Sequence, residues 1–306
     1  MTNTNSSASV TPSSASTGTA ASSASSSAST SAGSSATSTS STVAASVTSS
    51  PADKPGMTLI WSDEFTTNGL PDPRKWAYDT ERNRWGWYNN EKQYYAANRL
   101  ENARIEDGRL LITARKERLS SAPDFGGQNY TSARLLTRGL ASWTYGFFEI
   151  RAKMPCGAGT WPAIWTLGVG GANGMVWPND GEIDIMEYVG SDPTHVFATV
   201  HNAKYNWNGG IPPTTLKALV PDACTAFHNY QLSWTADKIA IGVDDRIYFE
   251  YAKPQDNDPR AWPFDRPQYL LLNIAIGGDL GGVVDDTIFP AVMSVEHVRI
   301  YKYNKP

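Results

Sequence analysis

A long succession of short β-branched and aromatic runs limits what this chain can fold into. Glycine and proline interrupt these runs too often for long helices, and apolar residues seldom recur at helical spacing. Runs typical of strands cover residues 109–115, 146–153, 161–167, 182–188, 196–201, 230–234, 238–243, 247–251, 269–276 and 295–301. So many short strands with turn signals between them predict an all-β fold, a two-sheet sandwich of the jelly-roll type.

The first 50 residues differ sharply in composition from the rest of the chain. Ser, Thr and Ala make up 41 of them, the first charged residue is Asp53, and the first aromatic residue is Trp61. Such a segment cannot bury enough apolar surface to offset its ordering entropy, so we expect residues 1–55 to be a disordered leader or linker. An O-glycosylated stalk is the alternative. Residues 56–306 have the length of one large domain with a full core.

Charge and motif content exclude several classes of function. Lys and Arg number 26 against 30 Asp and Glu, so the net charge of −4 provides no basic surface for nucleic acid or anionic membranes. No apolar run reaches the roughly 18 residues that a membrane span needs. The chain also lacks HExxH, CxxC, GxSxG and Walker motifs, which disfavours zinc hydrolases, thiol redox enzymes and nucleotide-binding enzymes.

The most informative segment for chemistry is 181–188, GEIDIMEY, which holds three acids within six residues. Strand alternation places Glu182 and Asp184 on one face, and a one-residue bulge near Met186 would return Glu187 to that face. Grouped carboxylates repel one another, so at least one pKa should rise. A protonated carboxyl beside an ionised one is the equipment of glycoside hydrolysis. A polar sheet face or a calcium site is the alternative interpretation.

This segment resembles the active-site signature of glycoside hydrolase family sixteen, in the bulged E-x-D-x-x-E form of its laminarinase branch. The similarity extends over nearly the whole domain. Matching motifs are WSDEF at 61–65, NEKQYY at 90–95, YG at 145–146, EIRAKMP at 149–155, GTWPAIW at 159–165, WP at 177–178, LNIAIGG at 272–278 and VRIY at 298–301. The resemblance implies a β-jelly roll with a concave substrate cleft.

The resemblance also implies a role for each of the three acids. Glu182 would be the nucleophile, Glu187 the general acid and base, and Asp184 would lie between them and orient Glu182. The family retains anomeric configuration, for which the two outer carboxyls should lie about 5 to 5.5 Å apart. This chemistry requires no cofactor.

Aromatic and polar residues near these motifs suggest how a sugar chain would bind. Trp161 and Trp165 stand four residues apart, so on one strand they share a face. By resemblance they line the cleft beside the cleaved bond, although core packing is an alternative for Trp165. The resemblance places further substrate-binding residues at Asn90, Glu91, His201, Trp143 and Arg138. A structural role is the alternative for His201.

Two departures from the laminarinase pattern are visible. Asp279 to Gly282 replace the Asn and Trp that usually follow the glycine pair, which leaves the substrate preference of that loop open. The family's structural calcium would here be bound by Glu64, the carbonyl of Gly108 and Glu296. Glutamate replaces aspartate at the last position, and its longer stem needs a shifted site.

The two cysteines, Cys156 and Cys224, and the N-terminal composition bear on the compartment. An oxidising compartment would allow the cysteines to pair, and two buried free thiols are the alternative. No basic n-region or apolar h-region of a signal peptide is visible. The Ser/Thr-rich start still fits a secreted or extracytoplasmic protein better than a cytosolic enzyme.

The sequence therefore predicts a monomeric endo-acting β-glucanase that cuts β-1,3 bonds in laminarin-like glucans, with mixed β-1,3/1,4 glucans as an additional candidate substrate. The same machinery could act on another polymer, such as a galactan, agar or carrageenan. A transglycosylase and a glucan-binding lectin on an inactive glycosidase scaffold are further alternatives. All three acids are present, which disfavours the lectin.

Overall fold

Each predicted strand run coincides with a strand to within a few residues, and the strands form two large antiparallel sheets. The computed structural model describes residues 53–171 and 174–304, within a unit that runs from Ser50 to Pro306. The disordered leader or stalk expected at the N-terminus lies outside the described residues, except for its last three positions. The all-β sandwich prediction is confirmed.

Sheet A has eight strands, in the order β15-β14-β13-β8-β17-β5-β4, and β1 pairs with β17 at one end of that long strand. These strands can join in one sheet because the long β17 pairs with β1, β5 and β8 along its length. The strands are β1 (Met57–Asp63), β4 (Ala103–Glu106), β5 (Arg109–Ala114), β8 (Gly146–Lys153), β13 (His228–Trp234), β14 (Lys238–Val243), β15 (Arg246–Ala252) and β17 (Ala291–Tyr303).

Sheet B has seven strands, in the order β12-β11-β10-β9-β16-β7-β2. They are β2 (Ala77–Tyr78), β7 (Arg134–Leu136), β9 (Thr160–Gly168), β10 (Glu182–Tyr188), β11 (His195–His201), β12 (Thr215–Leu219) and β16 (Gln268–Ile276). The remaining elements are the parallel pair β3 (Gln93–Tyr95) and β6 (Tyr130–Ser132) and the short helices η1 (Tyr88–Asn90), α1 (Gly278–Gly281) and η2 (Asp286–Ile288). None of the helices in the described residues is long and apolar enough to cross a membrane.

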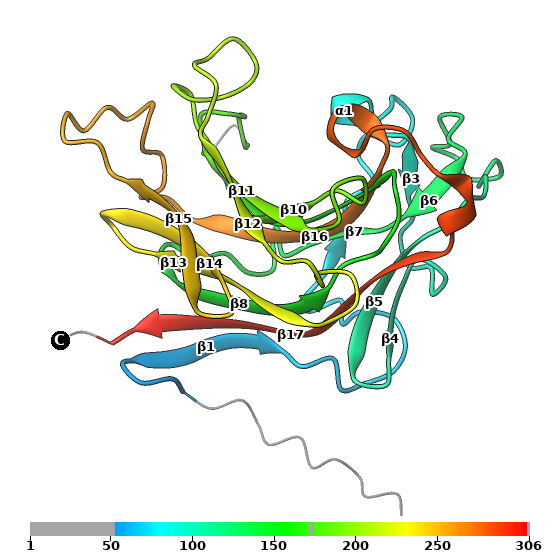
Figure 1. The fold of residues 1–306 in the computed structure, drawn as a ribbon, viewed down its shortest axis with the longest axis horizontal. Coiled ribbons are helices and arrows are strands. Elements are labelled where there is room, and N and C mark those ends of the chain that lie inside the picture. Colours follow the sequence, from blue (N-terminus) through cyan, green and yellow to red (C-terminus); the bar gives the residue numbers. More distant parts are fainter. Residues whose placement is uncertain (1–52, 172–173, 305–306) are drawn as a thin grey trace, which may run out of the picture. The chain divides into compact units, whose positions relative to one another are not determined.

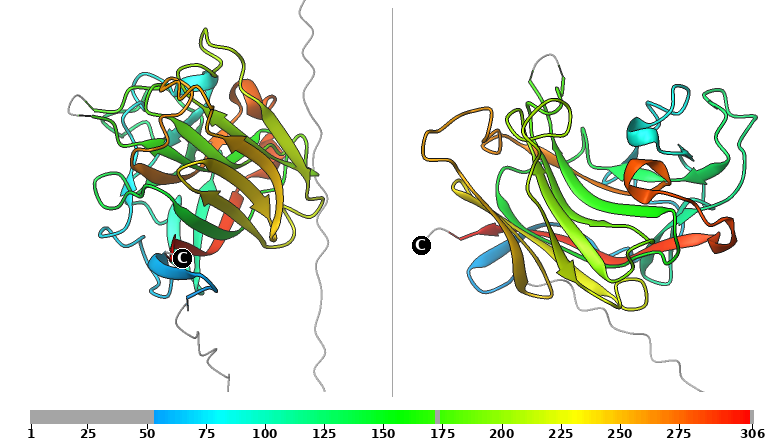
Figure 2. Two further views of the ribbon diagram at one scale, coloured as in Figure 1. Left: turned by 90° about the vertical axis from the view of Figure 1, so that its left-hand side faces the viewer. Right: turned by 45° about the horizontal axis from the view of Figure 1, so that its top comes forward.

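The two sheets stack face to face, and both are bent (Figure 1). Their inner faces share one apolar core, to which Ile183 and Ile185 of β10, Phe148 of β8 and Ile300 of β17 contribute fully buried side chains. The loop after β11 and the helix α1 rise on the outer side of sheet B (Figures 1 and 2). The outer face of sheet B also carries a smaller apolar cluster, Leu136, Leu167, Tyr269 and Leu271. This outer face is where polar groups of the central strands collect.

The start of the domain lies slightly before the predicted boundary at residue 56. Asp53 Oδ1 accepts a hydrogen bond from the backbone N–H of Leu59 at 2.7 Å. Lys54 Nζ forms an ion pair with Glu149 Oε2 of β8 at 2.5 Å and lies over the ring of Phe147. These two residues, which the composition assigned to the leader, therefore belong to the folded unit.

Cys156 and Cys224 form a disulfide, which is the first of the two alternatives that the sequence left open. The bond joins the loop before β9, in sheet B, to the loop before β13, in sheet A, across 68 positions of sequence. It therefore constrains a long segment of the unfolded chain.

Removing this disulfide should lower the stability of the domain. For a loop of this length the chain-entropy model gives about 4 kcal/mol. We expect Cys224→Ala to reduce the free energy of unfolding by about that amount, measured by urea denaturation. The wild-type chain with added reductant should shift to the same midpoint. An unchanged midpoint in both experiments would show that the disulfide contributes little.

Candidate active site

The three acids of β10 lie on the outer face of sheet B because the strand contains the predicted bulge. Asp184 pairs with Thr199 and Glu187 with Phe197 of β11, so two residues of β10 oppose one residue of its neighbour. The register against β9 shifts at the same place. Ile185 and Met186 both point into the core, and alternation then resumes with Glu187 facing outward.

The entry into β10 depends on glycine. Gly181 has a φ of +81°, and a Cβ there would lie 2.7 Å from the ring of Phe264 and 2.8 Å from Pro263. Only glycine tolerates both the left-handed backbone and the close contact. This turn starts β10 in the register that sends Ile183 into the core and leaves Glu182 outside.

Each of the two outer carboxylates accepts a hydrogen bond from an indole. Trp177 Nε1 donates to Glu182 Oε2 at 2.6 Å, and Trp161 Nε1 donates to Glu187 Oε1 at 2.8 Å. Trp177 belongs to the WP motif at 177–178, and its place four residues before Gly181 could have suggested this role. The two indoles fix the carboxylates at opposite ends of the acid group.

Asp184 lies between these two carboxylates and faces His201. Asp184 is only 3% exposed, and its Oδ2 is 3.2 Å from Nε2 of His201 at the end of β11. Ligand atoms of Glu182, Asp184 and His201 all lie within 4.8 Å of one another. The structure thus brings His201 to the acids, as the sequence predicted.

Burial and nearby negative charge raise the pKa values of Asp184 and Glu187. Burial raises the pKa of Asp184 well above its usual value, and the charges of Glu182 and Glu187 add to the effect. Burial also raises the pKa of Glu187, while the Trp161 indole opposes that rise. The predicted upward shift of at least one carboxyl is therefore present. Both groups therefore keep their protons to a higher pH than an ordinary carboxyl does.

A hydrogen-bonded network lies beside the acids, on β9 and β16. Trp165 Nε1 donates to Asn273 Oδ1 of β16 at 2.8 Å, and the Trp165 ring lies under the guanidinium of Arg134. Asn273 Nδ2 in turn donates to the hydroxyl of Tyr95 at 3.0 Å, and that hydroxyl approaches Glu91 Oε2 at 3.4 Å. Trp165 is thus on the outer face rather than in the main core, as its spacing from Trp161 indicated.

Glu91 and Asn90 lie at the border of the outer face of sheet B. Burial raises the pKa of Glu91, whose Oε2 also accepts from Gln93 Nε2 at 2.7 Å. Asn90 Nδ2 donates to Asp279 Oδ1 of α1 at 2.7 Å. A Cβ on Gly281 would lie 3.3 Å from Cβ of Trp161, so α1 packs directly beside that indole. The loop that departs from the laminarinase pattern therefore packs directly against Trp161.

Two predicted substrate-binding residues have other surroundings. Trp143 is 9% exposed and packs in the core against Trp61 and Phe148, so its assignment to the cleft is wrong. It faces inward because its backbone pairs with Gln268 at the end of β16. Arg138 forms an ion pair with Glu81 and lies 5.9 Å from the ring of Tyr269. Tyr269 is on the outer face of β16, which is two strands away from β10.

The residues expected to bind calcium do not fit that ion. Both oxygens of Glu64 accept hydrogen bonds from Arg299, at 3.0 and 2.7 Å. Glu296 Oε2 accepts from Arg151 Nε at 2.7 Å, and its other oxygen lies 3.8 Å from Arg109. Gly108 stands in the turn between β4 and β5. A cation bound to these carboxylates would have to displace the arginines or lie beside their positive charges. The arginines therefore neutralise the carboxylates in place of calcium.

A jelly-roll face that holds grouped carboxylates under indole donors defines a glycoside hydrolase. The model of the glycosyl hydrolases family 16 matches residues 90–285, and the chain belongs to this family.

The relatives of the chain support this assignment along nearly the whole folded unit. It is 48% identical over 263 residues to a β-glucanase from Rhodothermus marinus, covering 83% of this chain and 89% of that protein. A solved non-specific endo-β-1,3(4)-glucanase of the same family shares 49% identity with a TM-score of 0.78, over 83% of this chain and 94% of the other. An endo-β-1,3-glucanase structure from Pyrococcus furiosus shares 37% identity with a TM-score of 0.73, over 82% and 96%.

Proposed function

We propose that the protein is an endo-acting, retaining β-glucanase that hydrolyses β-1,3 linkages in laminarin-like glucans, with mixed β-1,3/1,4 glucans as a second substrate. The observation that carries this proposal is the bulge of β10, which presents Glu182 and Glu187 on one face on either side of Asp184. The similarity to glucanases of family 16 supports the choice of polymer.

In the first chemical step, Glu187 acts as the acid and Glu182 as the nucleophile. The raised pKa of Glu187 keeps its proton available for the glycosidic oxygen that leaves. Glu182 bonds to the anomeric carbon as the bond to that oxygen breaks, so a glycosyl-enzyme forms and one glucan fragment departs. The Trp177 indole holds the attacking carboxylate in place.

In the second step, the now ionised Glu187 takes a proton from water. The water oxygen bonds to the anomeric carbon, the bond to Glu182 breaks, and the starting configuration is restored. Asp184, whose pKa is raised by burial and by the charges of Glu182 and Glu187, lies between the two carboxylates and orients Glu182. All of these groups come from one chain, which is consistent with a monomer.

We infer that the enzyme works outside the cytoplasm. The Cys156–Cys224 disulfide supports this, because such bonds persist in oxidising compartments. A polymer too large to enter a cell also requires an external enzyme.

A product profile tests the substrate. The protein would be incubated with laminarin, barley mixed-linkage glucan, agarose and κ-carrageenan, and the oligosaccharides would be resolved over time. Early medium-length oligomers from laminarin are the expected result. Products from agarose or carrageenan without cleavage of either glucan would overturn the choice of polymer. Silence in all four would favour a binding protein, and products longer than the starting chains would indicate transglycosylation.

The Trp161 indole should set the alkaline limb of the pH profile. Its N–H stabilises ionised Glu187, so Trp161→Phe, which removes the donor but keeps an aromatic ring, should raise the pKa of Glu187 further. A higher pKa keeps the acid protonated to higher pH, so the alkaline limb of kcat/KM on laminarin should move upward. The limb should stay in place in the exposed control Trp85→Phe. An unmoved limb in Trp161→Phe would contradict the assignment of Glu187 as the acid.

A further inference from the structure

The acid group holds a polar atom that the described residues leave without a hydrogen-bond partner. Asp184 Oδ2 is buried and unpartnered in the described part of the chain. It faces His201 Nε2 at 3.2 Å without a well-aligned hydrogen bond. An unsatisfied buried polar atom is costly, so a ligand that binds Asp184 Oδ2 and His201 Nε2 together would bind favourably.

The types of atom select the class of ligand. One imidazole nitrogen and two carboxylate oxygens, from His201, Asp184 and Glu182, all lie within 4.8 Å of one another. The Trp177 indole donates to Oε2 of Glu182, and the carboxylate has a second oxygen that can bind a cation. Two or three such ligands with an open fourth position suit Zn²⁺, whereas Ca²⁺ and Mg²⁺ prefer oxygen alone.

We propose that Glu182, Asp184 and His201 form a binding site for Zn²⁺ and similar transition-metal cations, and that the bound cation inhibits the enzyme. A cation on Glu182 takes the lone pair that would attack the anomeric carbon, so the metal and the glucan exclude each other. The binding site depends only on the geometry, and the inhibition rests on the proposed function of Glu182.

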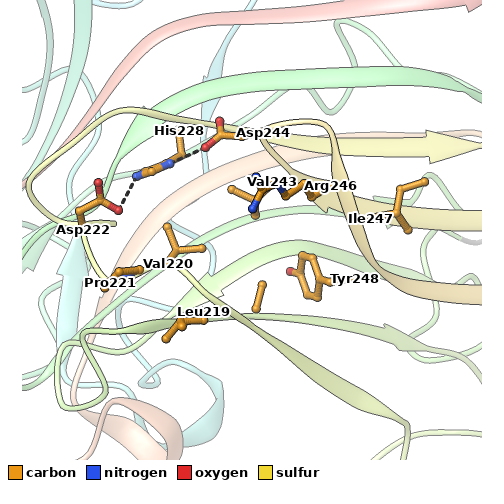
Figure 3. Close-up of a pocket in the computed structure, with 11 residues that line it drawn as sticks. Leu219, Val220, Pro221, Asp222, His228, Val243, Asp244, Arg246, Ile247 and Tyr248 are labelled. Carbon is orange, nitrogen blue, oxygen red and sulfur yellow. Dashed lines mark hydrogen bonds and ion pairs between the residues drawn. The ribbon is translucent and has the colours of Figure 1, made fainter.

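A second histidine with two carboxylate neighbours provides a matched control. In the pocket between β12 and the β14–β15 hairpin, His228 Nε2 lies 3.2 Å from Asp222 and Nδ1 lies 2.6 Å from Asp244 (Figure 3). The two carboxylates meet opposite ring nitrogens, so they do not converge on a single ion. His228→Ala should therefore leave zinc binding intact.

The experiment is a calorimetric titration of the full chain with ZnCl₂, with CaCl₂ and MgCl₂ in parallel. We expect saturable binding of a single Zn²⁺ by the wild type and by His228→Ala, and none of Ca²⁺ or Mg²⁺. Loss of a ligand should weaken zinc binding by about tenfold or more in His201→Ala. Asp184→Asn, which keeps the shape of the side chain, should weaken it similarly. Thermal unfolding would show that each variant is folded.

The results separate this proposal from the proposed function. Absence of saturable Zn²⁺ binding in the wild type, or wild-type zinc affinity in both His201→Ala and Asp184→Asn, would overturn the metal site while leaving hydrolysis untouched. Zinc binding in a protein that cleaves no glucan would support the site and contradict the function. Competitive inhibition of laminarin hydrolysis by Zn²⁺, with weaker zinc binding when laminarin oligosaccharides are added, would support both.

Discussion

Glu182→Gln should reduce kcat on laminarin by at least about 10⁴-fold, because groups that act as a unit in covalent catalysis lose nearly all of their rate enhancement when the nucleophile is removed. The amide cannot form the glycosyl-enzyme, yet it has the shape of the carboxylate and its oxygen can still accept from the Trp177 indole. Release of reducing sugar measures the loss.

Binding and stability should change little in Glu182→Gln, and this separates chemistry from structure. Laminarin oligosaccharides should still bind, and the midpoint of thermal unfolding should stay close to that of the wild type. Glu250→Gln is the matched control, since Glu250 lies on β15 of sheet A, paired with Lys238 in solvent. Turnover near the wild-type rate in Glu182→Gln would contradict its role as the nucleophile.

The central strand of the site was predictable because it obeys a simple alternation. Ile183 and Ile185 are apolar and Glu182 and Asp184 are not, which alone specifies the faces of β10. The return of Glu187 to the acid face required one bulge, and the apolar Met186 marks where it falls. The all-β fold and the positions of the three acids could be predicted from the local sequence pattern. Apolar residues mark the core face of each strand, and polar residues mark its other face.

The indoles were harder, since a tryptophan fits both a core and a sugar cleft. Trp165 lies on the outer face, as its spacing from Trp161 predicted, whereas the sequence around Trp143 did not indicate that it packs in the core. Their positions depend on pairing with β16, which is more than 100 residues distant for each. Asn273 was hidden for the same reason, because its contacts with Trp165 and Tyr95 join segments more than 100 residues apart. Trp177 lies only five residues before Glu182, so its local position could have indicated its role.

The carboxylates expected to bind calcium show a different limit of prediction from sequence. Glu64 and Glu296 are acids at the positions where a metal was expected, but their partners Arg299 and Arg151 come from other strands. A bidentate guanidinium satisfies a carboxylate as fully as a cation does. The sequence shows that charge is present, and only the fold shows which opposite charge meets it.

Glu187→Gln should lower turnover on laminarin by about 10² to 10⁴-fold, the usual contribution of a positioned acid and base. The loss should depend on the leaving group. In an aryl β-laminaribioside, an acidic phenol is the leaving group and needs no proton to depart. Glu182 should therefore form the glycosyl-enzyme from this substrate at close to the wild-type rate. A burst of phenol, followed by slow turnover, is the expected progress curve, because no base is left to activate water.

A small anion should then replace the missing base in this variant. Azide needs no deprotonation, so its nitrogen can bond to the anomeric carbon as the bond to Glu182 breaks, giving a β-glycosyl azide and faster steady turnover. The same addition should have no effect on Glu182→Gln, which forms no glycosyl-enzyme. Equal losses on laminarin and on the aryl substrate, with no acceleration by azide, would assign Glu187 to positioning. Glu187 acting as acid and base is the arrangement that the raised pKa and the Trp161 hydrogen bond favour.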